Sequence, residues 1–520
     1  MSTDSEMQVR SRSFRFGPRE TNGVVLGLGM GSLVAVFGAV FVLTRLLAHG
    51  GVGVAFGLGL VAGTVAVVWV PVADRPIAGW LPIAAVHLTR RVLGWASFRG
   101  GPAAVTGRAG RTVADGAEAL GLPGELSELA IVSVDTPAGP VGVIKDRRRG
   151  LYTLVLATEG SAFQLLTPDE QDARLASWGE TLAGLANSTA GIIRVHLTDT
   201  TVPDCGDSLA RRWLAEGGHG TDGTATSYGE LLETARPVTQ KHESHVALVL
   251  DPRKVRRQIR TLSGWRGNGQ PGQPAGRDAG AGAYLLQRAV AFADELTLAG
   301  VTVTGALPPR GVAKLLRTSY EPGARWAMEA RGPAEPANPG GGAATDEAGP
   351  AAADASAWAY YRTDDTFHAV YWIAEWPRHD VPGVFLQDLI LRTACERTLS
   401  VCLEPRDPRR AADEVARKQT AKGADENLRT RMGFGSTARN RREAAELSAQ
   451  DEELANGEAL YRFLGLIRIS APDLESLDRA CGDIEIAAKN LKLRRLYGEQ
   501  DAAFNATLPL GRGLRWGWLR

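Results

Sequence analysis

Two long apolar segments near the N-terminus dominate the pattern of hydrophobic and polar positions. A first run of 24 residues and a second of 28, separated by Arg45, contain no Asp, Glu, Lys or Arg. About 20 apolar residues in a helix cover the roughly 30 Å hydrocarbon core of a bilayer. The pattern predicts a transmembrane hairpin, with helices near Gly23–Leu43 and Val52–Val72 and a turn at Leu46–Gly51. A signal peptide is the alternative, but its apolar region is shorter and no second span would follow it.

The arginines around these segments predict their orientation. Four precede the first segment, four follow the second within about 25 residues, and Arg45 lies between them. Lys and Arg beside a span remain preferentially on the cytoplasmic side. We therefore expect a two-pass protein of the cytoplasmic (inner) membrane with both termini in the cytoplasm. The basic N-terminus covers residues 1–22, and residues 74–520 lie in the cytosol.

Glycines recur at four-residue spacing inside both segments. The pairs are Gly27 with Gly31 and Gly59 with Gly63. Small residues at this spacing allow two helix backbones to approach closely, so we predict helix packing in the membrane at these four positions. The string GLGMGS resembles part of a dinucleotide fingerprint, but it lacks the preceding strand that such a turn requires.

The segment that follows, within residues 73–126, is amphipathic. Trp80 lies among apolar residues, and Arg90 and Arg91 follow ten and eleven residues later. Such a helix can lie in the headgroup layer, with the aromatic ring at the interface and the arginines toward anionic lipid. It can equally pack as a juxtamembrane helix on the soluble part. The sequence leaves both open.

Short runs rich in Val, Ile, Leu and Thr, interspersed with helical periodicity, predict α+β domains in the remaining chain. We expect antiparallel sheets with packed helices in a domain over residues 127–263, an α/β segment over 283–331 and a second domain over 357–520. One expected helix is Thr167–Ala186, with Thr167 as its N-cap and acidic residues in its first turn.

Three segments interrupt this pattern. Residues 264–282 and 332–356 are rich in Gly, Ala and Pro, and we predict mobile surface linkers because they offer little apolar surface to bury. The segment Pro408–Leu454 is heavily charged and has no strand signal. It predicts one long helical hairpin that turns at Gly433–Ser436.

Charge and cysteine content narrow the function classes. The chain has 59 Lys plus Arg against 58 Asp plus Glu, a net charge of +1, whereas a nucleic-acid-binding domain usually carries a clear basic excess. The basic runs at 406–410 and 439–443 could touch nucleic acid or lipid, but their interspersed acids favour solvated helix faces. The sequence therefore does not by itself predict direct nucleic-acid binding. The four cysteines form no CxxC pair, which is typical of a reducing compartment.

The sequence contains candidate metal-ligating and catalytic residues, but no pattern brings them together in one site. His242 and His245 flank Glu243, yet residues three apart on a strand point to opposite faces and make poor joint ligands. A second polar set brackets an aromatic strand and fixes no nucleophile and base: Asp364, Asp365, His368, Glu375, His379 and Asp380. The chain also has no GxxxxGK[ST] loop. We therefore predict no catalytic residue, no metal site and no cofactor.

Two parts of the chain resemble known families. The basic start, the tight apolar hairpin and the segment GWLPIAAVHLTRRVLG resemble PrgI-like membrane proteins of Gram-positive conjugation and type IV secretion systems. Residues 367–513, which end in LRRLYGEQDAAFNATLPLG, resemble the N-terminal, non-motor domain of the large conjugation ATPases. The combination resembles an actinobacterial membrane protein of conjugation-like secretion loci. The residues that match the ATPase motif are Gln500, Phe504, Leu508, Pro509, Leu510 and Gly511.

The resemblance departs from those ATPases where their motor begins. In them the Leu-Pro-Leu-Gly stretch leads into a nucleotide-binding domain, whereas here Arg520 follows nine residues after Gly511 and no P-loop is present. The resemblance implies a non-enzymatic membrane component that anchors a motor-like domain and docks a separate ATPase. The six motif residues are candidates for docking or packing.

The implied partners are the lipid bilayer, a secretion ATPase and other membrane subunits in an oligomeric assembly. Two alternatives belong to other classes: a type VII secretion membrane component with a similar hairpin and cytosolic part, and a membrane-tethered enzyme of unknown class.

Overall fold

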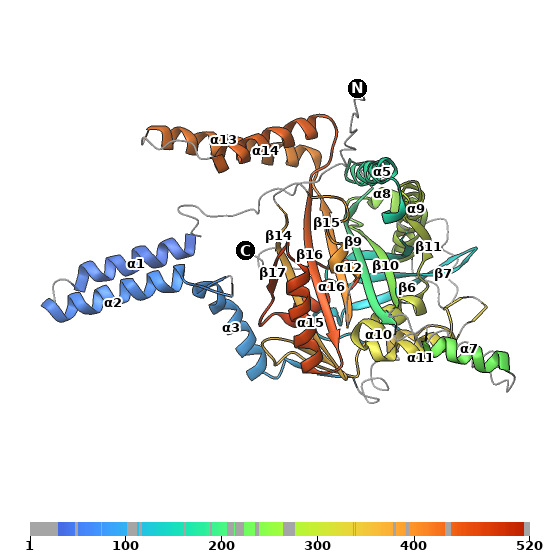
Figure 1. Cartoon of the computed structure of the whole chain (residues 1–520). Helices are drawn as coiled ribbons and strands as arrows, with labels where there is room; N and C mark the ends of the chain where they lie inside the picture. The colour runs from blue at the N-terminus through green and yellow to red at the C-terminus, as the bar shows by residue number, and fades with distance from the viewer. Residues whose placement is uncertain are drawn as a thin grey trace, which may run out of the picture.

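The computed structural model describes residues 30–513, with internal gaps. The gaps are 47–49, 74, 101–111, 114–116, 161–162, 188–189, 205–212, 214–222, 235–238, 264–275, 336, 339, 378–380, 392–394 and 432–437. The fold is α+β. Within the described residues, fifteen strands form one antiparallel sheet in the order β3-β12-β13-β14-β16-β15-β9-β10-β8-β7-β6-β5-β4, while β11 pairs with β8 and β17 with β14 (Figure 1).

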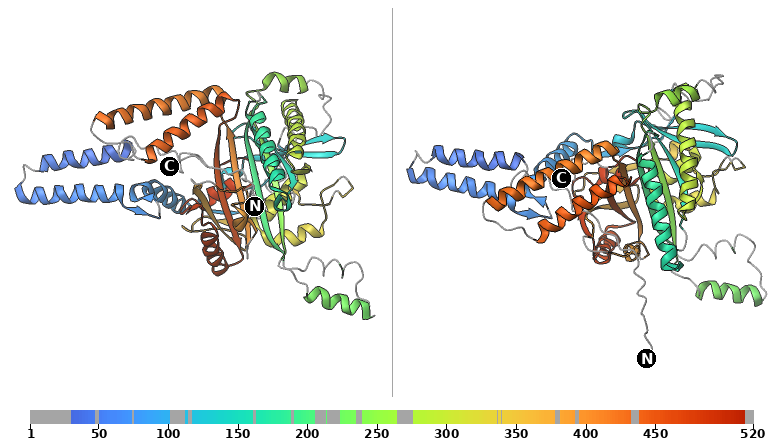
Figure 2. Two further views of the ribbon diagram at one scale, coloured as in Figure 1. Left: turned by 45° about the horizontal axis from the view of Figure 1, so that its top comes forward. Right: turned by 90° about the horizontal axis from the view of Figure 1, so that it is seen from above.

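An apolar helical hairpin stands apart from this sheet. It consists of α1 (Met30–Leu46) and α2 (Gly50–Trp69), which pack side by side (Figures 1 and 2). Among the described helices, α2 alone is long and apolar enough to cross a bilayer, and the apolar part of α1, Val34–Leu46, is shorter. The expected first helix begins outside the described residues. A short β1–β2 ribbon (Pro71–Val72 and Arg75–Pro76) then leads into α3 (Ile77–Val92).

The sheet contains two halves with the same connectivity. The first half runs β7 (Gly139–Asp146), β8 (Leu151–Glu159), α5 (Pro168–Asn187), β9 (Ile192–Asp204), α7 (Gly223–Thr234), β10 (Thr239–Leu250), α8 (Arg256–Ser263), α9 (Gly276–Leu298), β11 (Thr302–Ala306) and α10 (Pro309–Tyr320). In space the order is β7-β8-β10-β9, and β11 joins β8.

The second half repeats this plan. It runs β13 (Tyr361–Thr363), β14 (Thr366–Glu375), α12 (Gln387–Leu391), β15 (Glu396–Pro405), α13 (Pro408–Arg431), α14 (Ala438–Ala455), β16 (Tyr461–Ala471), α15 (Leu474–Ala487), β17 (Lys492–Arg495) and α16 (Gln500–Thr507). The order is β13-β14-β16-β15, and β17 joins β14. In each half, helices are inserted between the third and fourth strands: α7 in the first and the hairpin α13–α14 in the second.

The halves meet at β9 and β15, which pair over Val195↔Leu403 to Thr201↔Arg397. The segments that we expected as separate domains, 127–263 and 357–520, therefore share one sheet. The remaining elements extend its edges: β3 (Ser97–Arg99), β4 (Thr112–Val113), β5 (Ala117–Ala119), β6 (Leu129–Thr136), α11 (Arg325–Ala330) and β12 (Ala352–Asp354).

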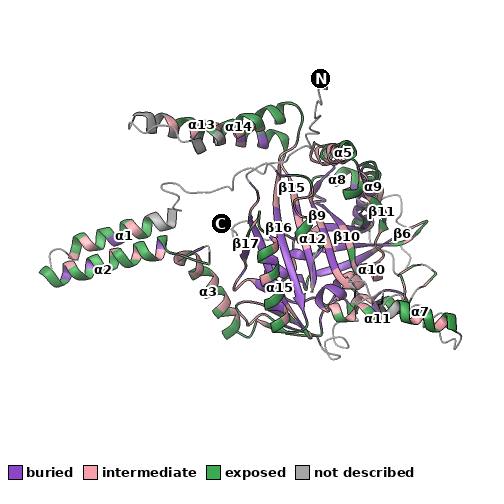
Figure 3. Cartoon of the chain, viewed as in Figure 1, coloured by how far each residue is buried: buried purple, intermediate pink, exposed green. Residues whose placement is uncertain are grey.

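Both faces of the sheet are covered, because alternate residues of each strand point to opposite sides. In β8, Leu154 packs into a core beneath α9, whereas Val155 points to the opposite core. In β14, Tyr371 packs beneath α15, whereas Val370 points to the same opposite core as Val155. That shared core lies beneath α10 and α16. Figure 3 shows the strands largely buried and the α1–α2 hairpin largely exposed.

The two segments expected as mobile linkers contain ordered parts, which corrects that prediction. Residues 276–282 form the start of α9, and Asp278 there is 5% exposed and accepts hydrogen bonds from Lys145 Nζ and Tyr152 Oη, both at 2.5 Å. In the second segment, Ala343 and Ala348 are fully buried. Arg310 and Arg317 donate to its backbone carbonyls, so polar side chains supply the binding energy that its small residues lack.

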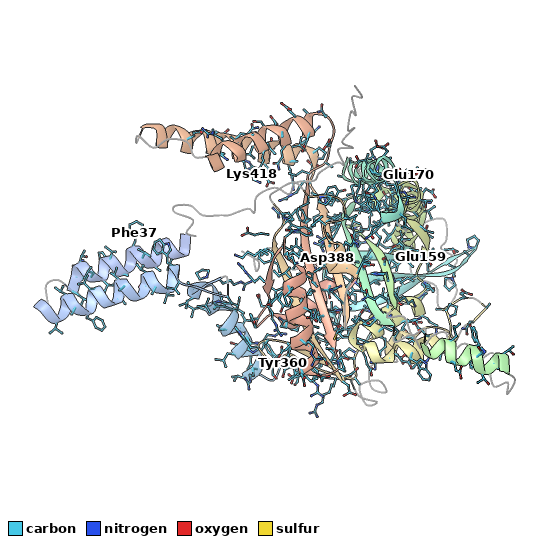
Figure 4. The ribbon with its side chains drawn as sticks, viewed as in Figure 1. Phe37, Glu159, Glu170, Tyr360, Asp388 and Lys418 are labelled. Carbon is cyan, nitrogen blue, oxygen red and sulfur yellow. The ribbon has the colours of Figure 1, made fainter. Side chains whose placement is uncertain are left out.

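The charged segment forms the expected helical hairpin, α13–α14. It extends from the end of the sheet toward the same side as α1–α2 (Figures 1 and 2). Its surface carries ion pairs one helical turn apart, such as Lys418 with Glu414 at 3.2 Å (Figure 4).

Candidate functional site

The six C-terminal motif residues all lie inside the fold. Gln500 is 2% exposed, and its side chain accepts a hydrogen bond from Val370 N at 2.8 Å and donates to Val370 O at 3.5 Å. Leu508 and Leu510 are buried in the core shared by the two halves. A partner therefore has no access to these side chains in this structure, and their contacts are with the sheet.

Phe504 forms the centre of an aromatic cluster between α10 and α16. Its ring centroid lies 4.6 Å from that of His368, 5.0 Å from that of Tyr320 and 5.3 Å from that of Tyr361. The Arg468 guanidinium is 5.0 Å from the same ring. Phe504 is completely buried, so α10 and α16, the corresponding helices of the two halves, meet through it.

A chain of charges crosses the interior beside this cluster. Arg468, 1% exposed, lies 3.8 Å from Glu396, which also pairs with Arg325 at 2.9 Å. Arg325 in turn pairs with Glu243. Burial lowers the pKa of Arg468 to about 10. Burial alone would raise the pKa of Glu243, but the charges of Arg325 and Lys241 lower it to about 2. The network is structural in character, because its buried charges are paired with one another.

The last described residues are fixed against the first half. Gly511 has φ +61°, and a Cβ there would lie 2.1 Å from Val249 Cγ2, so only glycine fits. Arg194 donates to the carbonyls of Gly511 and Arg512. Arg512 pairs with Asp146 at 3.1 Å. The C-terminal segment thus crosses from the second half to the first and ties them together.

The same segment is joined to the helix that follows the apolar hairpin. Arg75, just before α3, pairs with Glu499 at 3.3 Å, and Arg90, at the end of α3, forms a two-pronged ion pair with Asp501. The hydrogen bond to Asp501 raises the pKa of Arg90. We call these two ion pairs, with the aromatic contacts between them, the junction.

Aromatic rings fill the space between the two ion pairs. Trp80 packs against Trp358 at 5.9 Å and Tyr497 at 6.3 Å, and His87 lies edge-on to Trp358 at 5.0 Å. Burial raises the pKa of Glu499, and the adjacent guanidinium of Arg75 offsets part of that effect. The junction therefore combines apolar packing with two partly buried ion pairs.

The opposite side of α3 is apolar and exposed. Leu81, Leu88 and Val92 recur at a helical spacing on α3 and are 61%, 62% and 75% exposed, and Trp95, in the turn after the helix, is 70% exposed. Between α2 and α3, Ile77 N donates to Val70 O at 3.3 Å and Trp80 Nε1 donates to Val72 O at 2.8 Å. Of the two alternatives left open for this segment, packing on the soluble part is seen on one face of α3. The position in the headgroup layer stays a prediction.

Within the hairpin, the close approach of α1 and α2 occurs at Gly57. A Cβ there would lie 2.5 Å from Leu43 Cδ1 and 3.2 Å from Leu43 Cα. Gly59 and Gly63 have no atom within 4 Å of such a position, because they face away from α1. The prediction that Gly59 and Gly63 pack closely against α1 is therefore wrong. Their packing against a helix of another molecule stays a prediction. Gly27 and the surroundings of Gly31 lie outside the described residues.

The structure does not assemble the other candidate chemistry. His242 bonds to Asp199 at 3.1 Å, and the His245 side chain is not joined to it in any cluster. His368 is fully buried between Thr363 and Ser470, while Asp364 pairs with Arg317. His379 and Asp380 lie outside the described residues. Across the part of the chain that is described, no group of three His, Cys, Asp or Glu side chains is placed to hold a metal ion.

The sequence did not identify the pairings of the junction. Arg75 and Arg90 stood out only as charges beside a membrane segment, and Glu499 and Asp501 only as neighbours of Gln500. More than 400 residues separate the partners of each pair. No periodicity connects such positions, so this contact required the tertiary structure.

No family model matches the chain. No curated protein matches it either.

Proposed function

We propose that this protein is a non-enzymatic, two-pass membrane scaffold of a conjugation or type IV-like secretion apparatus, which holds a motor-like domain at the membrane and docks a separate ATPase. The observation that carries the proposal is the junction, where Arg75 and Arg90 beside the apolar hairpin pair with Glu499 and Asp501 of the ATPase-like segment. An anchor that only tethered the domain would need no such fixed contact.

The exposed face of α3 supports the membrane part of the proposal. Because α3 begins at Ile77, eight residues after α2 ends at Trp69, its first turn lies within about 29 Å of the hairpin's end even with the chain extended. We infer that α3 lies in the interface layer of the bilayer, with Leu81, Leu88 and Trp95 toward the acyl chains. Phe37 and the other exposed apolar side chains of α1 and α2 then contact lipid (Figure 4).

The junction couples the membrane anchor mechanically to the C-terminal segment. The side chain of Arg75 is 6% exposed and that of Glu499 14%, so separating them leaves charges buried without their partners. Breaking such a pair costs about 3 kcal/mol or more. The anchor and the C-terminal segment therefore move as one body, and force on the cytosolic part is passed to the membrane.

The proposal is tested by capture of partners from the native host. A tag at Arg520, mild detergent and mass spectrometry are applied to the unmodified protein, to an Arg75→Ala/Arg90→Ala variant and to Arg91→Ala as matched control. Arg91 is exposed on the same helix. We expect a P-loop secretion ATPase with the unmodified and control proteins, and less of it when the junction is broken. The pair Arg90→Asp/Asp501→Arg should restore capture.

The possible outcomes separate the parts of the proposal. Absence of a P-loop ATPase from all samples contradicts the docking function, and recovery of type VII core proteins instead supports that alternative machine. A reporter fused after Arg520 should be active in the cytoplasm, and activity only outside the membrane contradicts the topology. Equal capture with and without the junction contradicts its role.

A further inference from the structure

A row of arginines covers the outer side of α8. Arg256, Arg257 and Arg260 lie on the helix and Arg253 on the turn before it, at a spacing of i, i+3, i+4 and i+7 that places them on one side. All four are exposed. The opposite side of the helix is anchored, because Ile259 is buried in the core beneath α9. The arginines are thus held outward by a rigid element.

The turn between β7 and β8 extends this surface. Arg253 Nη2 donates to Arg149 O at 3.1 Å, which places the exposed Arg147 and Arg148 beside α8. With Lys254, the set has seven exposed cations: Arg147, Arg148, Arg253, Lys254, Arg256, Arg257 and Arg260. We call it the arginine face.

Few acids oppose these charges. Asp146 ends β7, Asp251 precedes α8, and Glu128 lies beside the β7–β8 turn, where its carbonyl accepts from Arg147 N. Asp146 pairs with Arg512 at 3.1 Å, and Asp251 Oδ1 accepts the backbone N–H of Arg253 at 2.9 Å. None of the seven cations forms an ion pair with a residue that the structure describes. The whole chain has a net charge of +1, so this cluster of seven cations departs locally from its overall charge balance. It makes a surface with unbalanced positive charge.

The location of the arginine face excludes the anchoring membrane as its partner. Figure 1 shows α8 at the end of the molecule away from α1 and α2, with β14, β16 and β15 between them in that view. The face instead lies next to the last described residues, because Arg149 Nη1 donates to Arg512 O at 3.1 Å. A soluble polyanion could reach it beside the C-terminal segment.

We propose that the arginine face binds the phosphate backbone of double-stranded nucleic acid without reading its sequence. Duplex DNA carries one negative charge per about 1.7 Å of its axis, a density that suits seven neighbouring cations. The planar guanidinium forks of six of them match phosphate oxygens in pairs. The described residues of the face include no aromatic side chain on which an unpaired base could stack, which favours duplex over single strands. This proposal is independent of the membrane scaffold function.

The test uses the full chain in detergent and a fluorescent duplex of about 30 base pairs, with anisotropy recorded between about 50 and 200 mM salt. The test variant is Arg256→Glu/Arg257→Glu/Arg260→Glu. The matched control, Arg409→Glu/Arg410→Glu/Arg417→Glu, makes the same change of net charge at exposed positions of α13. Because each phosphate contact contributes about 0.9 to the slope of log affinity against log salt, we expect the test variant to flatten the slope by about 3 and to weaken binding at least 100-fold. The control should bind within about threefold of the unmodified protein.

Three results would overturn the proposal. One is no binding by the unmodified protein at about 50 mM salt, and another is equal loss in the test and control variants. The third is binding of polyglutamate as tightly as the duplex, which would assign the face to an acidic protein instead. A Gln version of the three α8 changes, with unaltered thermal unfolding, separates loss of contact from loss of fold.

Discussion

Replacement of Phe504 by Ala tests whether the C-terminal motif is part of the core or a docking surface. Phe504 is 0% exposed, and its ring contacts those of His368, Tyr320 and Tyr361. As a core residue it should contribute to stability in every state of assembly. As a docking residue it should matter only when a partner is bound. The two interpretations predict different results for the isolated protein.

The expected cost follows from what Phe504→Ala removes. Loss of a fully buried Phe side chain, with the cavity that it leaves, costs about 3–5 kcal/mol. The change also removes the aromatic face 5.0 Å from the buried Arg468 guanidinium, a contact worth about 2 kcal/mol when it is desolvated. Part of this contact energy is already included in the roughly 3–5 kcal/mol, so we expect the free energy of unfolding to fall by about 4 kcal/mol in total. Total stabilities are about 5–15 kcal/mol, so the change is large.

Urea unfolding of the full chain in detergent, followed by circular dichroism, measures the effect. The control is Leu474→Ala at a position 41% exposed on α15, which should change stability by about 0.5 kcal/mol or less. The variant Phe504→Leu keeps much of the volume and should lose less than Phe504→Ala. If Phe504→Ala unfolds at the same urea concentration as the unmodified protein, while capture of an ATPase is lost, our assignment of Phe504 to the core is refuted.

Two further predictions concern acid stability and the hairpin. His196 and His368 are fully buried, and burial lowers the pKa of His196 to about 3 and that of His368 well below its ordinary value. Because the unfolded chain binds protons first, stability should be full above about pH 6.5 and fall below it, by about 3 kcal/mol in total for both at pH 5.5. Urea midpoints at pH 7.5 and 5.5 measure this, and His368→Gln should remove the share of His368, about 1.4 kcal/mol, from the loss. Equal midpoints of the unmodified protein would contradict it. In the hairpin, Gly57→Ile meets Leu43 and should lower thermal stability in detergent, whereas Gly59→Ile faces open space within the chain and should not. Equal effects of the two changes would contradict the assigned contact.

Local signals in the sequence predicted most of the individual elements. The helix α5 spans Pro168–Asn187, within one residue of its expected bounds, because Thr167 and Glu170 cap its first turn reciprocally. The β6, β7 and β8 strands coincide with short runs rich in Val, Ile, Leu and Thr, the composition that indicated strands in the sequence. These signals are local, since a cap or a strand pattern depends on neighbours within a few residues. The membrane topology stays a prediction.

Failures arose where small residues are held by distant side chains. Residues 332–356 looked unable to pack, yet Arg310 and Arg317 bind their carbonyls from α10. The buried start of α9 at Asp278 depends on Lys145 and Tyr152, more than 100 residues earlier. Composition describes a segment alone, so it cannot register partners supplied by the rest of the chain.

The sequence by itself determined the apolar hairpin, the charged hairpin α13–α14 and the alternation of strands and helices, because periodicity encodes which face of each element is apolar. Only the tertiary structure decided that two halves of the same connectivity share one sheet through β9 and β15. It also decided that Arg75 and Arg90 meet Glu499 and Asp501. Pairing across hundreds of residues is chosen by the global balance of burial and charge, which no local pattern contains.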